Sequence, residues 1–178
     1  MSLSDLASIG SLVSGVAVVG SLVFLAVQIR QSNLNQRAIV HQTRVTRSAD
    51  LVLRAIEPSL LQAWMMGASG DPDIGAEQHW QYVHLMRTFL LGMEDTFFQH
   101  RLGLIEDSVF LGVSQLNYRH FAQPGMRAAW KQLRDVFDPA FAVYGDKLAE
   151  EGRRSVGLIN LEEWLKLADQ EKKLQERA

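Results

Sequence analysis

The chain has no cysteine among its 178 residues, which excludes disulfide bonds, thiolate catalysis and cysteine metal ligands. Lysine is scarce, since only five of the 18 basic residues are lysines, and 20 acidic residues leave a net charge of -2. A balanced charge provides no broad positive field for a polyanion, so nucleic acid is not an expected partner. One stretch of the chain also lacks charged residues: no Asp, Glu, Lys or Arg occurs from Leu6 to Ile29.

This uncharged stretch of 24 residues predicts a transmembrane helix. A helix needs about 20 largely apolar residues to cross the hydrocarbon core of a bilayer. A cleaved signal peptide is the alternative, and such peptides begin with a basic region and contain a shorter apolar core. Residues 1–5 contain no Lys or Arg, so the sequence favours a membrane anchor over a signal peptide.

The charges on either side of the stretch predict its orientation. Residues 30–54 contain five arginines and a single acid, whereas the residues before the stretch contain only Asp5. Cytoplasmic flanks collect Arg and Lys, so we expect a single-pass protein of the bacterial inner membrane with an external N-terminus and a cytoplasmic C-terminal domain. The arginines either form a solvated helix face or also contact anionic headgroups, at ~1 kcal/mol per residue. The membrane-flank residues are Arg30, Arg37, Arg44 and Arg47.

Helix-compatible segments separated by proline and glycine cover the rest of the chain. Residues 28–56 contain neither proline nor glycine, which predicts one helix of about 50 residues that includes the anchor and ends before Pro58. Asp138 and Pro139 are typical of an N-cap and a first helical position, and Asn160 is a second candidate cap. No alternating apolar pattern typical of strands is present. The other expected helices are residues 59–66, 76–102, 106–121, 126–137, 139–151 and 161–177.

The predicted fold class is therefore all-α, with one N-terminal transmembrane helix that continues into a helical stalk and is followed by a helical-bundle domain. The expected segments are residues 1–29 for the tail and transmembrane helix, 30–57 for the stalk, and 58–178 for the cytoplasmic helical domain. A chain of this length leaves room for one compact domain after the anchor.

Small and polar residues recur along one face of the anchor at alternating steps of three and four, which is a 3.5-residue period. In lipid, small residues allow helix backbones to approach, and hydroxyl groups bond across the contact. The pattern favours a helix–helix interface. Two alternatives stay open: a monomeric anchor whose serines bond their own backbone, and a pore whose hydroxyls face water. The candidate interface or pore residues are Ser4, Ala7, Ser11, Ser14, Gly15, Ser21 and Gln28.

The sequence predicts no catalytic, cofactor-binding or metal-binding residues. A helical carboxylate-bridged metal site shows Glu-x-x-His pairs, and none of the five histidines stands in one. His100 and His120 lie next to apolar residues, which favours packing with one hydrogen bond over a ligand role. Arg87, Glu94 and Arg101 are spaced by seven, which favours a structural ion-pair ladder or contact with a facing helix.

Two parts of the chain together resemble a known group of proteins. They are the start, Ser11 to Arg37, with its Leu-Ala-Val-Gln-Ile-Arg exit, and the block Glu94 to Phe141. The chain is similar to a set of uncharacterised bacterial single-span membrane proteins with a C-terminal helical domain and a Glu-x-x-x-x-Gln-x-Arg-x-Gly-Leu-like segment. Here that segment reads Glu94, Gln99, Arg101, Gly103 and Leu104. The resemblance implies topology and fold, and it implies no activity.

The function expected from these patterns is that of a homo-oligomeric scaffold or interaction module in the membrane. Its expected partners are further copies of itself and the lipid bilayer, including anionic headgroups. A homo-oligomeric ion channel lined by the serine-rich face is the first alternative. A membrane-bound enzyme of unknown reaction is the second, and it requires a polar, concave site in the helical domain. The sequence favours a non-enzymatic role and does not define copy number, ion or partner protein.

Overall fold

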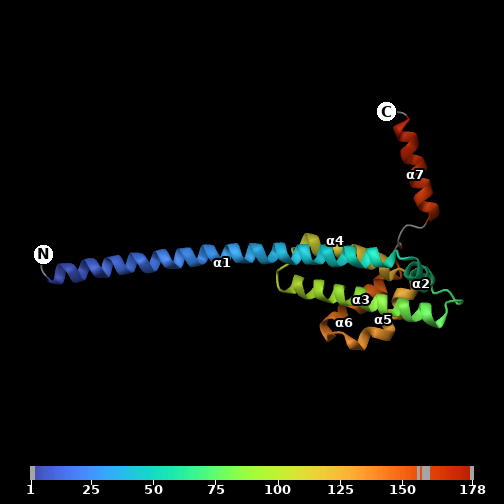
Figure 1. The fold of residues 1–178 in the computed structure, drawn as a ribbon, viewed down its shortest axis with the longest axis horizontal. Helices are drawn as coiled ribbons and strands as arrows, with labels where there is room; N and C mark the ends of the chain where they lie inside the picture. Colours follow the sequence, from blue (N-terminus) through green and yellow to red (C-terminus); the bar gives the residue numbers. More distant parts are fainter. Residues whose placement is uncertain (1–2, 156, 158–160, 177–178) are drawn as a thin grey trace. The chain divides into compact units, whose positions relative to one another are not determined.

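The computed structural model describes residues 3–155, 157 and 161–176, without the side chains of residues 5–7 and 9. These described residues form seven α-helices and one 3-10 helix, and none of them lies in a strand. The expected all-α fold with a long N-terminal helix is confirmed (Figure 1). The chain divides into two compact units, Met1–Val45 and Thr46–Ala178. The three segments expected from charge and from Pro58 stay a prediction.

The first helix, α1, runs without interruption from Leu3 to Ala55, as the lack of proline and glycine in its second half predicts. It ends where expected, because the ring of Pro58 disfavours a helical conformation in the preceding residue. Glu57 is accordingly extended, with φ -60° and ψ 136°. Pro58 is then the first residue of α2, Pro58–Ser69, a position where its missing N–H is not needed.

Glycines in the left-handed conformation end α2 and the longest helix of the second unit, α3, Ala76–Arg101. Gly70 has φ 69° and Gly103 has φ 71°, values that cost glycine little because it has no Cβ. After α2, the N–H of Gly70 donates to the Gly67 carbonyl and the N–H of Asp71 donates to the Met66 carbonyl. The same pattern follows α3, so both helix ends have their last carbonyls satisfied.

The segment expected as one helix over residues 126–137 differs from that expectation. Helix α4, Asp107–Phe121, is followed by α5, Pro124–Leu133, and then by a short 3-10 helix, η1, Arg134–Val136. Helix α5 begins at Pro124 itself, because proline is favourable at the first position of a helix. The expected start was two residues too late, and the expected α-helix extended over a turn that is 3-10.

The cap expected at Asp138 is confirmed. Its Oδ1 accepts a hydrogen bond of 2.7 Å from the N–H of Ala140, and Pro139 opens α6, Pro139–Gly152. The last helix, α7, spans Leu161–Gln175, close to the expected 161–177. The cap expected at Asn160 lies outside the described residues.

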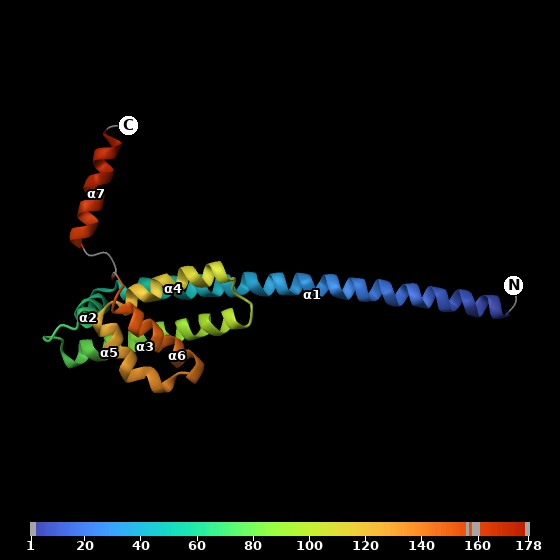
Figure 2. The ribbon, with the colours of Figure 1, turned by 180° about the vertical axis from the view of Figure 1, so that it is seen from behind.

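The core of the second unit forms where five of its helices meet. Helix α3 packs against α2, α4 and α5, and α6 packs against α4 and α5 (Figure 2). Trp130 of α5 lies near the middle of this core, edge-on to Phe121 and Phe141 with ring centroids 6.2 and 5.8 Å apart. The expected core-facing side of α3 is buried at Tyr82, Met86, Leu90 and Met93. The largest fully buried side chains are Trp130, Phe121, Phe141, Met86, Leu90, Met126 and Leu148.

Three helix pairs of this core approach so closely that only glycine fits at the contact. A Cβ at Gly125 of α5 would overlap the carbonyl oxygen of Gly67 in α2, and a Cβ at Gly67 would overlap the ring of Tyr82 in α3. A Cβ at Gly145 of α6 would likewise overlap the Trp130 ring. These glycines let bulky side chains such as Tyr82 and Trp130 pack directly against the backbone of a neighbouring helix.

Candidate functional site

The first part of α1 is exposed in a way that a helix in water is not. Gly10–Ala55 is long and apolar enough to cross a membrane, and its most apolar part has no buried residue. Every side chain from residue 10 to residue 39 is exposed, with Leu12 at 69% and Val16 at 67%. Large contiguous apolar surfaces mark sites that another molecule or a membrane covers. This stretch is therefore a candidate membrane span, as the sequence predicts.

The polar residues predicted on one face of the span differ in how their hydrogen-bonding groups are used. The hydroxyl of Ser21 donates to the carbonyl of Ala17 at 2.8 Å, and that of Ser8 donates to the carbonyl of Ser4 at 2.9 Å. Ser11 and Ser14 make no such bond among the described residues, and both side chains are exposed. The alternative of serines bonded to their own backbone thus holds for two positions, while Ser11 and Ser14 keep their donors available.

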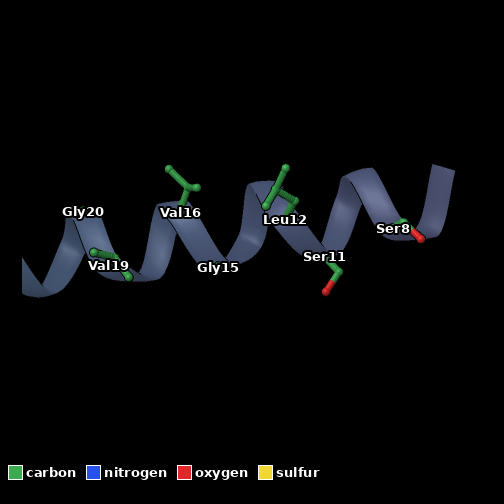
Figure 3. Close-up of a pocket in the computed structure, with 7 residues that line it drawn as sticks. All are labelled: Ser8, Ser11, Leu12, Gly15, Val16, Val19 and Gly20. Atoms are coloured by element: carbon green, nitrogen blue, oxygen red, sulfur yellow. The ribbon is translucent and has the colours of Figure 1, made fainter. Parts of the chain in front are cut away.

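A shallow hollow lies on the same helix, beside the predicted face (Figure 3). Gly15 and Gly20 interrupt the row of side chains, and a Cβ at either would have nothing within 4 Å. The side chains of Ser8 and Ser11 point to one side of this hollow and those of Leu12 and Val16 point to the other. The hollow is an open notch on one helix, so it suits a side chain or ridge of another helix better than an enclosed small molecule.

The structure brings two of the predicted interface residues, Ser11 and Gly15, into this notch. Ser14, Ser21 and Gln28 lie outside it, and the side chain of Ala7 is not described. Gly20 lines the notch but was not among the predicted residues, because the 3.5-residue period passes through positions 18 and 21 and not through position 20. The small size of Gly20, considered without any spacing rule, is the sequence signal that would have identified it. The notch is lined by Ser8, Ser11, Leu12, Gly15, Val16, Val19 and Gly20.

The predicted basic flank separates into two kinds of arginine. Arg30 and Arg37 are exposed, and the described residues hold no ion pair with either of them. Arg47 instead pairs with Asp95 of α3, Nη1 to Oδ2 at 2.7 Å, and the same carboxylate accepts from Nε2 of Gln99 at 3.0 Å. Arg44 is half-buried. Of these four arginines, Arg30 and Arg37 are both exposed and unpaired among the described residues, so they are the better candidates for a contact with lipid headgroups, whereas the exposed guanidinium of Arg47 is engaged by Asp95.

The candidate polar residues of the second unit have structural partners. Glu94 does not join a ladder with Arg87 and Arg101 in the described structure, because its Oε1 accepts from the N–H of Asp138 at 2.8 Å. Arg101 lies over the rings of Phe97 and Phe98, with Cζ 5.7 and 5.9 Å from their centroids. Glu94 thus contacts a facing segment at Asp138, as one of the two expectations has it, and the described residues show no ion-pair ladder with Arg87 and Arg101.

The two histidines pack against aromatic rings, as the sequence predicts, but among the described residues only His100 has the expected side-chain hydrogen-bond partner. The His100 ring stacks on Phe110 with centroids 4.0 Å apart, and its Nε2 lies 2.8 Å from Oδ1 of Asp107. The His120 ring lies 4.5 Å from that of Phe89 and 6.0 Å from that of Trp64. Burial lowers the pKa of His120 from 6.5 to about 4, so the imidazole is neutral at pH 7.

The described residues hold no group of three or more His, Asp or Glu side chains able to bind a metal ion. The surface that remains for a functional assignment is thus the face of the candidate span with its notch. Comparison of the chain with known protein families, with curated proteins and with solved structures finds no match in any of the three.

Proposed function

We propose that this chain is a single-span membrane protein that self-associates through the notched face of α1 and carries a helical domain as an interaction scaffold. One observation supports the proposal above the others: the uncharged, apolar segment of α1 from residue 10 to residue 29 has every residue exposed. Such a surface is unfavourable in water, at about 25 cal/mol per Å² of apolar area, and a bilayer covers it.

The bilayer alone does not bring two such helices together, because lipid tails solvate apolar side chains as well as a second helix does. Close backbone approach and hydrogen bonds across the contact must supply the attraction. Gly15 and Gly20 leave the room for that approach, and the hydroxyls of Ser11 and Ser14 have donors that are not used within their own helix. Three of these residues, Ser11, Gly15 and Gly20, line the notch, so they favour the notched face over the bulky remainder of the span.

Oligomeric mass in lipid nanodiscs tests this proposal. We expect the wild-type mass to exceed that of one chain. Gly15→Leu and Ser11→Leu fill the notch and should each weaken association roughly fivefold, which corresponds to about 1 kcal/mol. Gly10→Leu is the matched control, because it makes the same substitution about 140° around the helix from Gly15, outside the notch, and it should leave the mass unchanged. A wild-type mass of one chain would refute self-association.

Ion conduction is the competing role for the same helix, and it is measured on the same preparation. Flux of small ions from liposomes that contain the confirmed oligomer, abolished by Ser21→Leu, would replace the scaffold with a channel. An oligomer without flux keeps the scaffold. The donor of Ser21 already bonds the Ala17 carbonyl, so only its oxygen lone pairs would face water.

The proposed orientation places the N-terminus outside and the helical domain in the cytoplasm, because the arginines follow the span. The absence of native cysteine makes a labelling test direct. With an impermeant maleimide on intact spheroplasts, Leu3→Cys should react, and Gln115→Cys should react only after the membrane is opened. The reverse pattern would invert the proposed topology.

A further inference from the structure

The end of α1 has one side that packs against the core of the second unit and one side that does not. Leu51 and Ala55 are half-buried and pack against that core. The residues on the other side are all exposed, and we call them the Ala49 face: Thr46, Ala49, Val52, Leu53 and Ile56. Ile56 directly follows the helix and continues its pattern, because its N–H donates to the carbonyl of Val52 at 3.2 Å. The three large apolar side chains of this face are 59–61% exposed.

The charged residues of the same segment lie outside the Ala49 face. At about 100° per residue, all members of the face lie within about 60° of Ala49. Arg47 and Arg54 instead lie within about 60° of Leu51, and Asp50 lies about 100° from Ala49. The outer side of a helix in water usually carries its charges, and here the apolar residues take that side. The reversed distribution indicates that the Ala49 face is a contact surface.

The spacing of the Ala49 face indicates which partner fits. The 3.5-residue period of the span, continued from Gln28 by the same steps, meets no charged residue. It passes through residues 32, 35, 39 and 42 and then through Thr46, Ala49, Leu53 and Ile56. A 3.5-residue period is typical of helices that pair in a left-handed coiled coil. The face therefore fits a second helix that carries the same period.

We propose that the Ala49 faces of two copies of this chain pair in parallel and form a short coiled coil. Every copy enters the membrane in the same direction, because the same arginines set its orientation. The two helices then present the same residue at the same height. Ala49 lies at the middle of the face, where its small side chain permits close approach, and Val52, Leu53 and Ile56 cover their counterparts.

This inference rests on the proposed self-association of the span and extends that contact to the end of α1. A coiled coil of three turns is weak alone. It forms because the contact between the spans holds the two copies at a high effective concentration.

Disulfide trapping in the full-length protein tests the pairing, since the chain has no native cysteine. The Ala49→Cys chain is oxidised in the membranes of the cells that express it, so that insertion sets its orientation. We expect a disulfide-linked homodimer, because position 49 of one copy meets position 49 of the other within the ~4–7 Å between Cα atoms that a disulfide spans. The position is exposed, so the substitution leaves the fold intact.

Arg54→Cys is the matched control, because it is also exposed but lies about 140° around the helix from Ala49. It should yield about tenfold less homodimer, because thiols turned apart have a low effective concentration. Equal yields from Ala49→Cys and Arg54→Cys would overturn the pairing through the Ala49 face.

A mixture of Ala49→Cys and Ile56→Cys chains, distinguished by mass, tests the parallel register. Seven residues of helix separate the two positions by about 10 Å, so homodimers should exceed the heterodimer. A dominant heterodimer would overturn the parallel arrangement.

Oligomeric mass in nanodiscs, measured without oxidation, separates this inference from the proposed function. An oligomer whose Ala49→Cys chain forms no disulfide overturns the pairing of the Ala49 faces and leaves self-association of the span in place. A one-chain mass with no disulfide overturns both. A disulfide at position 49 together with a mass that Gly15→Leu does not change supports the pairing of the Ala49 faces and overturns the contact through the notch.

Discussion

The indole Nε1–H of Trp130 in α5 donates a hydrogen bond of 3.1 Å to Oδ1 of Asp146 in α6. Trp130 is only 2% exposed, so its one polar atom has few other partners within reach. The guanidinium of Arg134 also donates to Asp146, from Nε and Nη2 at distances of 2.7 to 3.0 Å. The bonds from Arg134 and Trp130 hold the pKa of the Asp146 carboxyl below its ordinary value.

This relationship predicts that Asp146→Ala destabilises the second unit through Trp130. The change leaves a buried N–H without an acceptor, which costs about 1–3 kcal/mol. Asp146→Asn keeps a carbonyl oxygen for the indole and should cost less, since it removes only the exposed charge interaction with Arg134. Chemical denaturation followed by near-UV circular dichroism measures both. An Asn variant as unstable as the Ala variant would contradict the primary role given to Trp130.

Gly125→Ala should destabilise the second unit because α2 and α5 cross at this position. The added methyl group overlaps the Gly67 backbone, which cannot yield as a flexible side chain can. Overpacking of this kind costs about 1–3 kcal/mol or more. Thermal unfolding monitored by circular dichroism gives the comparison.

Gly112→Ala is the control for that experiment, because a Cβ at Gly112 of α4 has nothing within 4 Å. Alanine is the better helix former there, so the variant should gain about 0.5–1 kcal/mol. If both glycine variants changed stability in the same direction, the close approach at Gly125 would not be the cause of its effect.

The burial of His120 predicts a pH-dependent stability with a defined sign. The unfolded chain takes up a proton near pH 6.5, whereas the folded state takes one up only near pH 4. Between these values the unfolded state binds more protons, so stability is full above pH 6.5 and is lost as the pH falls toward 4. The loss attributable to this residue is on the order of 3 kcal/mol.

Denaturation midpoints at several pH values measure this effect, and His120→Gln removes the titrating group. The variant should lose most of the slope between pH 4 and 6.5. The contribution of Asp146 is separate, because the bond from Arg134 lowers the pKa of its carboxyl, so that contribution is lost only at pH values below the ordinary range of an aspartate. An unchanged slope in the variant would assign the pH dependence to another group.

Unpaired and paired arginines should differ in their effect on lipid binding. Replacing Arg30 and Arg37 by Gln should weaken retention of anionic lipid roughly fivefold per residue, at ~1 kcal/mol each. Arg47→Gln should leave it unchanged, because Arg47 is paired with Asp95. Native mass spectrometry of detergent-released complexes counts the bound lipids. If Arg30→Gln and Arg47→Gln lost equal numbers of bound lipids, the ion pair with Asp95 would not prevent Arg47 from binding lipid.

Helix ends were predictable because they depend on a few neighbouring residues. The end of α1 before Pro58, the turn at Gly103 and the cap at Asp138 each follow from local backbone preferences, and all three are found. The start of α5 was misplaced because Pro124 and Gly125 together suggested a break. In the fold, Pro124 opens the helix and Gly125 is required by the contact with α2.

The candidate site was only partly predictable. The 3.5-residue period identified Ser11, and the four-residue spacing of small residues from Ala7 through Ser11 added Gly15, but neither pattern includes Gly20. It also could not show that Ser8 and Ser21 bond their own backbone, because that depends on rotamers.

By itself, the sequence determined the all-helical fold, the end of α1 before Pro58, the turn at Gly103, the cap at Asp138, and the uncharged stretch that makes α1 a candidate span. Periodicity and backbone preference depend on residues that are close together in the chain, so both can be recognised from the sequence alone. Only the tertiary structure decided that Arg47 pairs with Asp95, that Asp146 serves Trp130 and that His120 is held neutral. These contacts join residues 16 to 48 positions apart or arise from burial, and packing of the whole unit is what brings such groups together.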